Sequence, residues 1–177
     1  MTLDCGPNSS RAMSAIMHRD DFIRAMASVA SSVTVVTTDG PAGRFGQTVS
    51  SFCSVSADPP QMLGCLRSES PICRAIESNG CFAISILSDS QAPVADTFAG
   101  RADTGVSYDF SAGNWIEDCL GCPILPFVPA SFSCALQQRV VSGTHCIYIG
   151  RVVSVDLAEA SPLIYRARTY GRYLPLP

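Results

Sequence analysis

The alternation of apolar and polar positions predicts a chain made mainly of strands, with two or three short helices. Phe22, Ile23, Met26 and Val29 recur at helical spacing after Asp20, which predicts an amphipathic helix with Asp20 as its N-cap. From residue 32 onward the period changes, and β-branched or alternating runs predict about seven strands. These are Ser32–Thr38, Phe45–Ser56, Gln61–Arg67, Cys81–Leu87, Ser131–Val141, His145–Asp156 and Leu163–Arg168.

Capping and turn residues (serine, proline and glycine) predict where two further helices and one hairpin begin and end. A helix is expected over Pro71–Asn79, with Ser70 as its N-cap and Gly80 after its last turn. A second helix is expected from a cap at Ser88 to Phe98, and residues 142–144 form the turn of a hairpin. Because strands and helices do not alternate, the pattern favours an antiparallel barrel over a doubly wound sheet.

The domain organisation follows from the same pattern. Residues 1–17 are small, polar and aperiodic, which predicts a mobile tail, and residues 18–177 then form one domain. Within that domain, residues 100–118 show no regular period and are expected to form a long loop.

Composition narrows the classes of function. The 177 residues are 47% hydrophobic and 15% charged, which excludes an intrinsically disordered chain. The net charge is −3 without any basic run, so neither a nucleic acid nor a membrane is an expected partner. The chain contains no lysine, which excludes Schiff-base chemistry and the lysine of a phosphate-binding loop. With only two histidines, no metal site is expected.

The nine cysteines are spread along the chain, most of them among apolar neighbours. Residues 1–18 carry no continuous apolar run of the kind found in a signal peptide. We therefore expect reduced, buried thiols in a cytoplasmic protein. Cys119 and Cys122 are the one close pair, for which a redox or zinc role is the alternative.

The strand predicted at residues 45–56 is dense in hydroxyl groups. Strict alternation would place Thr48, Ser50, Phe52 and Ser54 on one face. A row of hydroxyl and backbone N–H donors suits the polar edge of a planar heterocycle. A solvated edge strand would show the same pattern, so both interpretations stay open.

A second segment has the character of a phosphate site. Arg67, Ser68 and Ser70 come directly before the helix predicted at Pro71, where free N–H groups attract anions. Ordinary capping by Ser70 would also explain the serine. Since the two segments lie on consecutive strands, together they predict a flat, phosphorylated cofactor. The only glycine cluster, Gly40 to Gly46, has the wrong spacing for a dinucleotide-binding turn.

The hydroxyl-rich run from Thr48 to Ser56, followed by Asp58-Pro59-Pro60, resembles the signature of the flavin reductase-like family. The resemblance extends over about residues 21–173 and includes, in order, Thr34–Thr38, Phe98–Arg101, Gly143–His145 and Tyr165–Arg172. It implies an antiparallel split β-barrel in a homodimer, with the flavin near the subunit interface. It also implies FAD or FMN as the flavin and NADH or NADPH as the co-substrate.

The resemblance also assigns roles to residues. Thr48, Ser50 and Ser51 would contact the pyrimidine edge and ribityl side of the flavin, while Arg168 and Tyr170 would lie on the nicotinamide side with His145, the candidate catalytic residue. Cys65, Arg67 and Ser70 fall on the ribityl–phosphate side, Phe98, Ala99 and Gly100 fall near the phosphate or adenylate, and Gln47, Val49 and Leu66 complete the candidate cofactor-binding set. The chain departs from the family where the usual Gly-Asp-His reads Gly143-Thr144-His145, and where Arg67 replaces the usual asparagine.

The function that these inferences predict is an NAD(P)H:flavin oxidoreductase. It would pass a hydride to flavin and supply reduced flavin by diffusion to a partner monooxygenase, in aromatic degradation or antibiotic biosynthesis. The alternatives are a non-catalytic flavin carrier or sensor on the same fold, an oxidase with permanently bound flavin, and a haem-binding barrel. Haem would need an axial ligand, for which His145 is the available side chain.

Overall fold

The structure is a computed structural model that describes residues 18–103 and 105–176, so the tail expected at residues 1–17 lies outside the described residues. The helices are α1 (Arg19–Ala27), α2 (Pro71–Asn79) and α3 (Ala92–Phe98). The strands are β1 (Ser31–Ser32), β2 (Thr34–Thr38), β3 (Phe45–Val49), β4 (Phe52–Ala57), β5 (Pro60–Arg67), β6 (Cys81–Ile86), β7 (Ile116–Glu117), β8 (Pro123–Ile124), β9 (Ala130–Ser142), β10 (His145–Leu157), β11 (Leu163–Arg166) and β12 (Thr169–Arg172).

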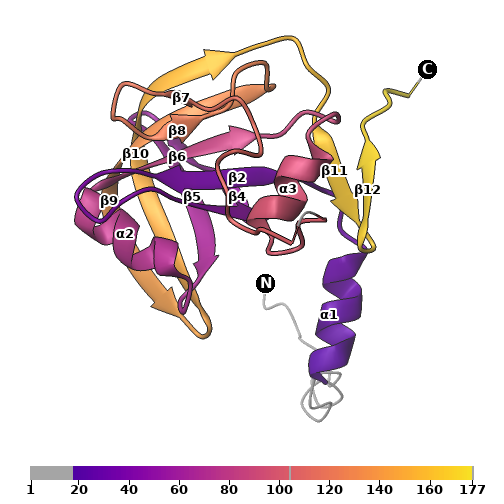
Figure 1. The fold of residues 1–177 in the computed structure, drawn as a ribbon. Coiled ribbons are helices and arrows are strands. Elements are labelled where there is room, and N and C mark those ends of the chain that lie inside the picture. The colour runs from indigo at the N-terminus through magenta and orange to yellow at the C-terminus, as the bar shows by residue number, and fades with distance from the viewer. Residues whose placement is uncertain (1–17, 104, 177) are drawn as a thin grey trace, which may run out of the picture.

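Seven strands form one antiparallel sheet in the order β3-β2-β6-β9-β10-β5-β4 (Figure 1). β3 and β4 are the two edges of this sheet, although only Ser50 and Ser51 separate them in the sequence. β3 also contacts β5, from which four strands separate it in the sheet. The sheet therefore curls until its edges meet. The prediction of a mainly β, antiparallel barrel is confirmed.

The strand predicted at residues 45–56 is in fact two strands, because the chain crosses there from one sheet edge to the other. β3 pairs with β2, whereas β4 pairs with β5. Ser50 and Ser51 form the corner between them, and both are exposed. The expected alternation of faces does not hold across this corner, so Ser50 and Ser51 share no strand face with Phe52 or Ser54.

The core explains why the helices lie close to the sheet edges. The barrel interior is filled by large apolar side chains such as Phe82 and Leu66, together with the buried Tyr148. A second cluster under α3 centres on Phe98, whose ring packs edge-on against Trp115 at a centroid distance of 5.3 Å. A Cβ atom at Gly46 in β3 would come within 2.6 Å of the Phe98 ring. Glycine at this position therefore lets α3 sit directly against the edge strand.

The α2 bounds agree with the prediction, and the hairpin of β9 and β10 is confirmed. Gly80 ends α2 with a φ of 72°, a conformation that favours glycine. Ser70 is the N-cap residue, but its side chain makes no capping hydrogen bond. α3 begins at Ala92 and not at Ser88, because Ser88 still pairs with Pro162 in an isolated bridge.

The C-terminal strand expected at residues 163–168 is a hairpin of β11 and β12, which joins β1 in a small separate sheet. Its turn residues are Ala167 and Arg168, which have φ values of 50° and 64°. Neither is a glycine or asparagine, so no residue type typical of a tight turn marks this point. Two further short strands, β7 and β8, pair within and after the region expected to be a loop.

α1 departs most from expectation. Its N-cap is His18, not Asp20, and none of its side chains is buried. The apolar residues Phe22 and Met26 are 52% and 53% exposed. Figure 1 shows α1 projecting from the body below the β11–β12 hairpin, where the Ala167 N–H donates to the Ala27 carbonyl at 2.8 Å.

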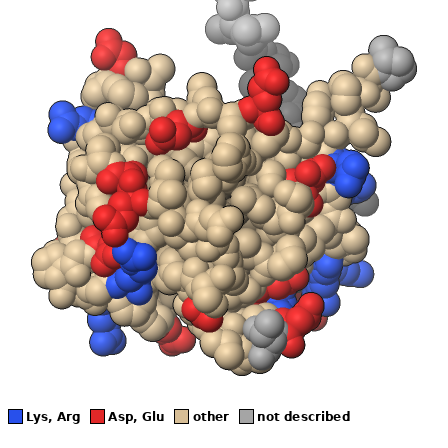
Figure 2. All heavy atoms as spheres, turned by 45° about the horizontal axis from the view of Figure 1, so that its top comes forward, with Lys and Arg blue, Asp and Glu red and all other residues tan. Residues whose placement is uncertain are grey.

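Two further observations concern the surface and the thiols. On the face in Figure 2, acidic and basic side chains lie scattered around a wide uncharged area. Within residues 18–103 and 105–176, no helix has the length and apolar character to cross a membrane. All eight cysteines in this part of the chain are free, while Cys5 lies outside the described residues.

Candidate functional site

Three hollows follow one another along β3 and the corner after it. The first, about 520 Å³, lies between β3 and the start of α2; the second, about 170 Å³, lies between the end of β3 and β12. The third, about 650 Å³, lies between the corner, α1 and the β11–β12 hairpin. Gln47 and Thr48 are consecutive residues that line the first and second hollows, and Ser50 lines both the second and the third. The three hollows therefore form one row beside the point where the sheet edges meet.

Most of the residues that the sequence singled out line this row. Gln47, Arg67 and Ser70 line the first hollow; Thr48, Val49, Ser50, Ala99 and Tyr170 line the second; Ser50, Ser51, Cys65, His145 and Arg168 line the third. Leu66 and Phe98 are buried in the core, and with Gly100 they line none of the three. Any contact of Leu66 or Phe98 with a ligand would therefore come from the backbone.

The corner presents hydroxyl groups in two different conditions. The Thr48 hydroxyl donates to the Ala95 carbonyl of α3 at 2.8 Å, so it has no proton left to donate to a ligand. The exposed hydroxyls of Ser50 and Ser51 make no hydrogen bond to any other described residue. The Ser51 carbonyl accepts a hydrogen bond from the Cys65 N–H at 2.9 Å, which ties the corner to β5. The Ser51 backbone is thus tied to β5, while the hydroxyls of Ser50 and Ser51 are free to donate to a ligand.

The first hollow brings together a cation and a buried acceptor. Arg67 ends β5 and forms no ion pair with any described residue, and Ser70 follows at the start of α2. The Gln47 Oε1 atom is buried and has no hydrogen-bond partner among the described residues. Because a buried acceptor without a partner is costly, Gln47 suggests a ligand with hydroxyl or N–H groups at this point.

A hydrogen-bonded network closes the second hollow. The Tyr170 hydroxyl donates to Asp96 at 2.8 Å, and Arg101 donates to the same hydroxyl at 3.1 Å and contacts Asp96. Burial, followed by the hydrogen bond to Asp96, raises the pKa of Tyr170 to about 12. Tyr170 therefore stays protonated at neutral pH, and the network ties the C-terminal hairpin to α3.

His145 stands at the rim of the third hollow, half-buried at the start of β10. Its Nδ1 lies 2.9 Å from the Thr144 hydroxyl, and its cross-strand neighbour in β5 is Arg67. The N–H and the hydroxyl of Ser68 both donate to the Thr144 carbonyl, at 3.0 and 3.1 Å. Threonine at position 144 therefore orients the imidazole from its hydroxyl, while its carbonyl anchors the hairpin tip to the loop before α2.

Arg168 reaches the third hollow from a strained turn. Its φ of 64° and that of Ala167, 50°, are rarely adopted by residues other than glycine, asparagine and aspartate. The hydrogen bond from Ala167 to α1, and one from the Arg166 Nε to the Ser28 carbonyl at 3.0 Å, hold the turn in place. Strained turns of this kind cluster at ligand-binding sites.

Sequence reasoning missed several residues of the row. Arg44, Glu69 and Tyr108 line the first hollow, while Arg101 and Tyr165 line the second. The position of Arg101 directly after the Phe98-Ala99-Gly100 run was a usable signal. Arg44 and Tyr108 lie far apart in the sequence and meet only in the fold, so no local pattern could have paired them.

The residues present fit a flavin and a nicotinamide. The two free serine hydroxyls offer donors to ring carbonyls, the orphaned Gln47 oxygen offers an acceptor to hydroxyls, and Arg67 offers a cation to a phosphate. Among residues 18–103 and 105–176, no group of three or more His, Cys, Asp or Glu side chains could hold a metal ion.

The fold and the row of hollows together define the protein as an antiparallel barrel suited to bind a flat, polar ligand where its sheet edges meet. A family model described as "Flavin reductase like domain" matches residues 26–173, and the chain belongs to this family. It is 37% identical over 166 residues to the FMN reductase (NADH) RutF of Ancylobacter novellus, covering 92% of this chain and 90% of the relative. It is 33% identical over 156 residues to the RutF of Variovorax paradoxus, covering 88% and 86%.

Solved structures agree with this assignment. The flavin reductase PheA2 superposes with a TM-score of 0.81 at 28% identity, covering 90% of this chain and all of that chain. The Streptomyces globisporus NADH:FAD oxidoreductase SgcE6, in complex with NAD and FAD fragments, gives 0.80 at 26%, covering 89% and 93%. The styrene monooxygenase flavin reductase of Pseudomonas putida S12 gives 0.75 at 30%, covering 89% and 99%. The expected split barrel is confirmed.

Proposed function

We propose that this chain is an NADH:flavin oxidoreductase that supplies reduced flavin to a flavin-dependent monooxygenase. The observation that carries the proposal is the pair of free hydroxyls of Ser50 and Ser51 at the corner, in hollows that Arg67 and His145, cross-strand neighbours in β5 and β10, also line. The relatives named FMN reductase (NADH) support the flavin and the choice of NADH. The neighbour that serves styrene monooxygenase supports the partner class.

In this proposal the chain acts mainly by positioning. A flavin, when bound, would supply the ring that accepts the hydride of NADH. Ser50 and Ser51 donate to the carbonyl edge of that ring, where negative charge develops, and Arg67 with Ser70 binds the phosphate. His145, oriented by Thr144, hydrogen-bonds the nicotinamide nucleotide, and Arg168 and Tyr170 border it on the side of the C-terminal hairpin.

We also propose that the protein works as a homodimer in the cytoplasm. The apolar residues Phe22 and Met26 of α1, and Val29 just after it, are exposed, and they line the third hollow. A second copy packed on α1 would cover these side chains and complete the wall around His145. Exposed apolar patches of this kind mark interaction surfaces.

The test is steady-state oxidation of NADH by the purified protein with added FMN, with FAD or with no flavin. The proposal expects turnover only when flavin is present. A protein that binds flavin tightly without oxidising NADH would be a carrier or sensor, and the proposal would be wrong. Turnover that needs no added flavin would indicate an oxidase with a permanently bound cofactor.

A further inference from the structure

Two cysteine thiols that line none of the three hollows contact each other inside the fold. Cys81 begins β6 and Cys122 directly precedes β8, 41 positions later in the sequence, and their Sγ atoms lie 3.4 Å apart. Cys122 is fully buried, and Cys81 is 8% exposed. Cys119, the neighbour of Cys122 in the sequence, is exposed. The contact of Cys122 in the fold is therefore with the distant Cys81.

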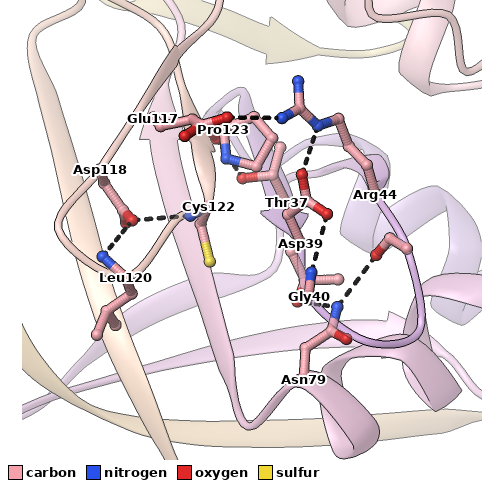
Figure 3. Close-up of polar contacts among 12 residues, drawn as sticks. Thr37, Asp39, Gly40, Arg44, Asn79, Glu117, Asp118, Leu120, Cys122 and Pro123 are labelled. Atoms are coloured by element: carbon pink, nitrogen blue, oxygen red, sulfur yellow. Dashed lines mark hydrogen bonds and ion pairs between the residues drawn. The ribbon is translucent and has the colours of Figure 1, made fainter.

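Hydrogen bonds hold the backbone on both sides of this pair. The Cys122 N–H donates to the Asp118 carboxylate at 2.8 Å, and the Cys122 carbonyl accepts from the Asp118 N–H at 2.9 Å (Figure 3). The Cys81 carbonyl accepts from the Thr38 hydroxyl at 2.7 Å. A disulfide bond is about 2.05 Å long, so the two Sγ atoms need to approach by about 1.4 Å. Rotation of the two side chains supplies a movement of this size while the backbone stays in place.

The surroundings of the two thiols favour uncharged sulfur. Cys81 and Cys122 belong to a small apolar cluster with Ala83 and Ile124. Burial raises the pKa of the Cys122 thiol, as do the contact with Cys81 and the nearby charge of Asp118. A metal ion would need both sulfurs as thiolates, which this environment penalises. Two protonated thiols and a disulfide are both neutral, so either state suits the same apolar space.

We propose that Cys81 and Cys122 form a reversible disulfide when the protein meets hydrogen peroxide. The peroxide oxidises the Cys81 sulfur, the one with solvent contact, to a sulfenic acid and releases one water. The Cys122 thiol then attacks that sulfur, the S–S bond forms, and the hydroxyl group leaves with the thiol proton as a second water. Two thiols and one peroxide thus give one disulfide and two waters, and a dithiol reductant reverses the change.

The disulfide itself does not depend on the proposed function, which bears only on the source of the peroxide. Reduced flavin that reacts with oxygen gives oxidised flavin and hydrogen peroxide. A protein that releases reduced flavin would therefore meet this oxidant whenever the flavin fails to reach its monooxygenase.

The new bond would add a covalent tie where the fold has only weak ones. The Thr37 hydroxyl donates to the Pro123 carbonyl at 2.5 Å, and Arg44 donates to Glu117 at 3.1 Å (Figure 3). These contacts join β2 and the turn after it to the segment that carries Cys122. A disulfide that closes a loop of this length restricts the unfolded chain strongly, so it should stabilise the folded protein. The hollows should keep their shape, since neither cysteine lines them.

The test compares reduced protein with protein treated with excess hydrogen peroxide. Peptide mapping by mass spectrometry should find the peptides of Cys81 and Cys122 joined in the treated sample, and separate again after dithiothreitol. The midpoint of thermal unfolding should rise by about 5–10 °C on oxidation and return on reduction. A crosslink that joins other cysteines in place of this pair, no crosslink, or an unchanged midpoint would overturn the proposal.

Three variants serve as controls. Cys81→Ser and Cys122→Ser should each abolish the crosslink and the rise of the midpoint, whereas Cys119→Ser should keep both. Each rise is measured between the reduced and oxidised samples of one variant, so a loss of stability from the substitution itself cancels. A rise that persists in Cys122→Ser, or disappears in Cys119→Ser, would contradict the assignment of the pair.

Discussion

Two hydroxyl-rich segments of the barrel, β2 and the corner after β3, differ in whether their hydroxyl groups are already hydrogen-bonded. In β2, Thr34, Thr37 and Thr38 are fully buried, and each hydroxyl donates to a backbone carbonyl, that of Val49, Pro123 and Cys81 respectively. At the corner after β3, Ser50 and Ser51 are exposed and their hydroxyls have no partner in the described part of the chain. The two segments look alike in composition. Buried hydroxyls that donate within the fold stabilise it, whereas exposed hydroxyls without a partner are available to a ligand.

The largest effect is expected on flavin affinity when the corner at Ser50 and Ser51 is changed. Ser51→Val leaves a flavin acceptor without its donor, which typically costs about 1–3 kcal/mol of binding free energy, or about fivefold to more than a hundredfold in the dissociation constant. Titration of the protein with FAD or FMN measures this. Ser54→Val, an exposed serine of β4 outside the row, is the matched control. Equal affinities in the two variants would mean that the corner is only a solvated edge.

The next effect concerns His145, which lines the third hollow. His145→Ala removes one hydrogen bond to the nicotinamide nucleotide, so we expect kcat/KM for NADH to fall about tenfold to a hundredfold. Most of the loss should appear in KM, with flavin affinity nearly unchanged, in a steady-state assay that varies NADH. If flavin affinity falls instead, His145 belongs to the flavin side of the site.

A smaller effect is expected in β2, and on stability alone. Thr38→Val removes the donor to the buried Cys81 carbonyl and the acceptor for the Asn79 side chain at 3.1 Å. We expect the free energy of unfolding to fall by about 1–2 kcal/mol, while flavin affinity stays within about twofold. Chemical denaturation and flavin titration of the same sample measure both. A large loss of flavin affinity at unchanged stability would contradict the view that the β2 hydroxyls stabilise the fold and do not bind the flavin.

The smallest effect appears only at alkaline pH. Folding raises the pKa of Tyr170 from its usual value near 10 to about 12, so between these values the folded state holds a proton that the unfolded state has lost. The free energy of unfolding therefore decreases as the pH rises from about 10 to about 12. Tyr170→Phe removes this titration and should make the decrease shallower, as measured by urea unfolding across that range. An unchanged slope would mean that Tyr170 does not form its hydrogen bond to Asp96 in solution.

The sequence predicted those parts of the fold that carry a local signal. The α2 helix was found at its observed bounds because Ser70-Pro71 and Gly80 mark both ends, and the turn at residues 142–144 gave the long hairpin. The break at Ser50 and Ser51 was missed because neither glycine nor proline marks it, and only the closure of the sheet imposes a corner. The β11–β12 hairpin was missed because Ala167 and Arg168 are not turn formers.

The candidate site was predictable to the same extent. Gln47, Ser50 and Arg67 belong to continuous motifs, and the structure places them in one row. Arg44 and Tyr108 come from a turn and a long loop, where no periodicity constrains them. Their place in the cavity depends on the ion pairs of Arg44 and on the hydrogen bond of Tyr108 to α3, which exist only in the folded chain.

The most direct test of the central claim is a crystal structure of the protein with a bound flavin. The ring is expected to lie against the corner with Ser50 and Ser51 donating to its carbonyl edge, and the phosphate is expected to lie beside Arg67 and Ser70. A flavin ring bound outside the row of hollows, with both serine hydroxyls still facing solvent, would contradict it.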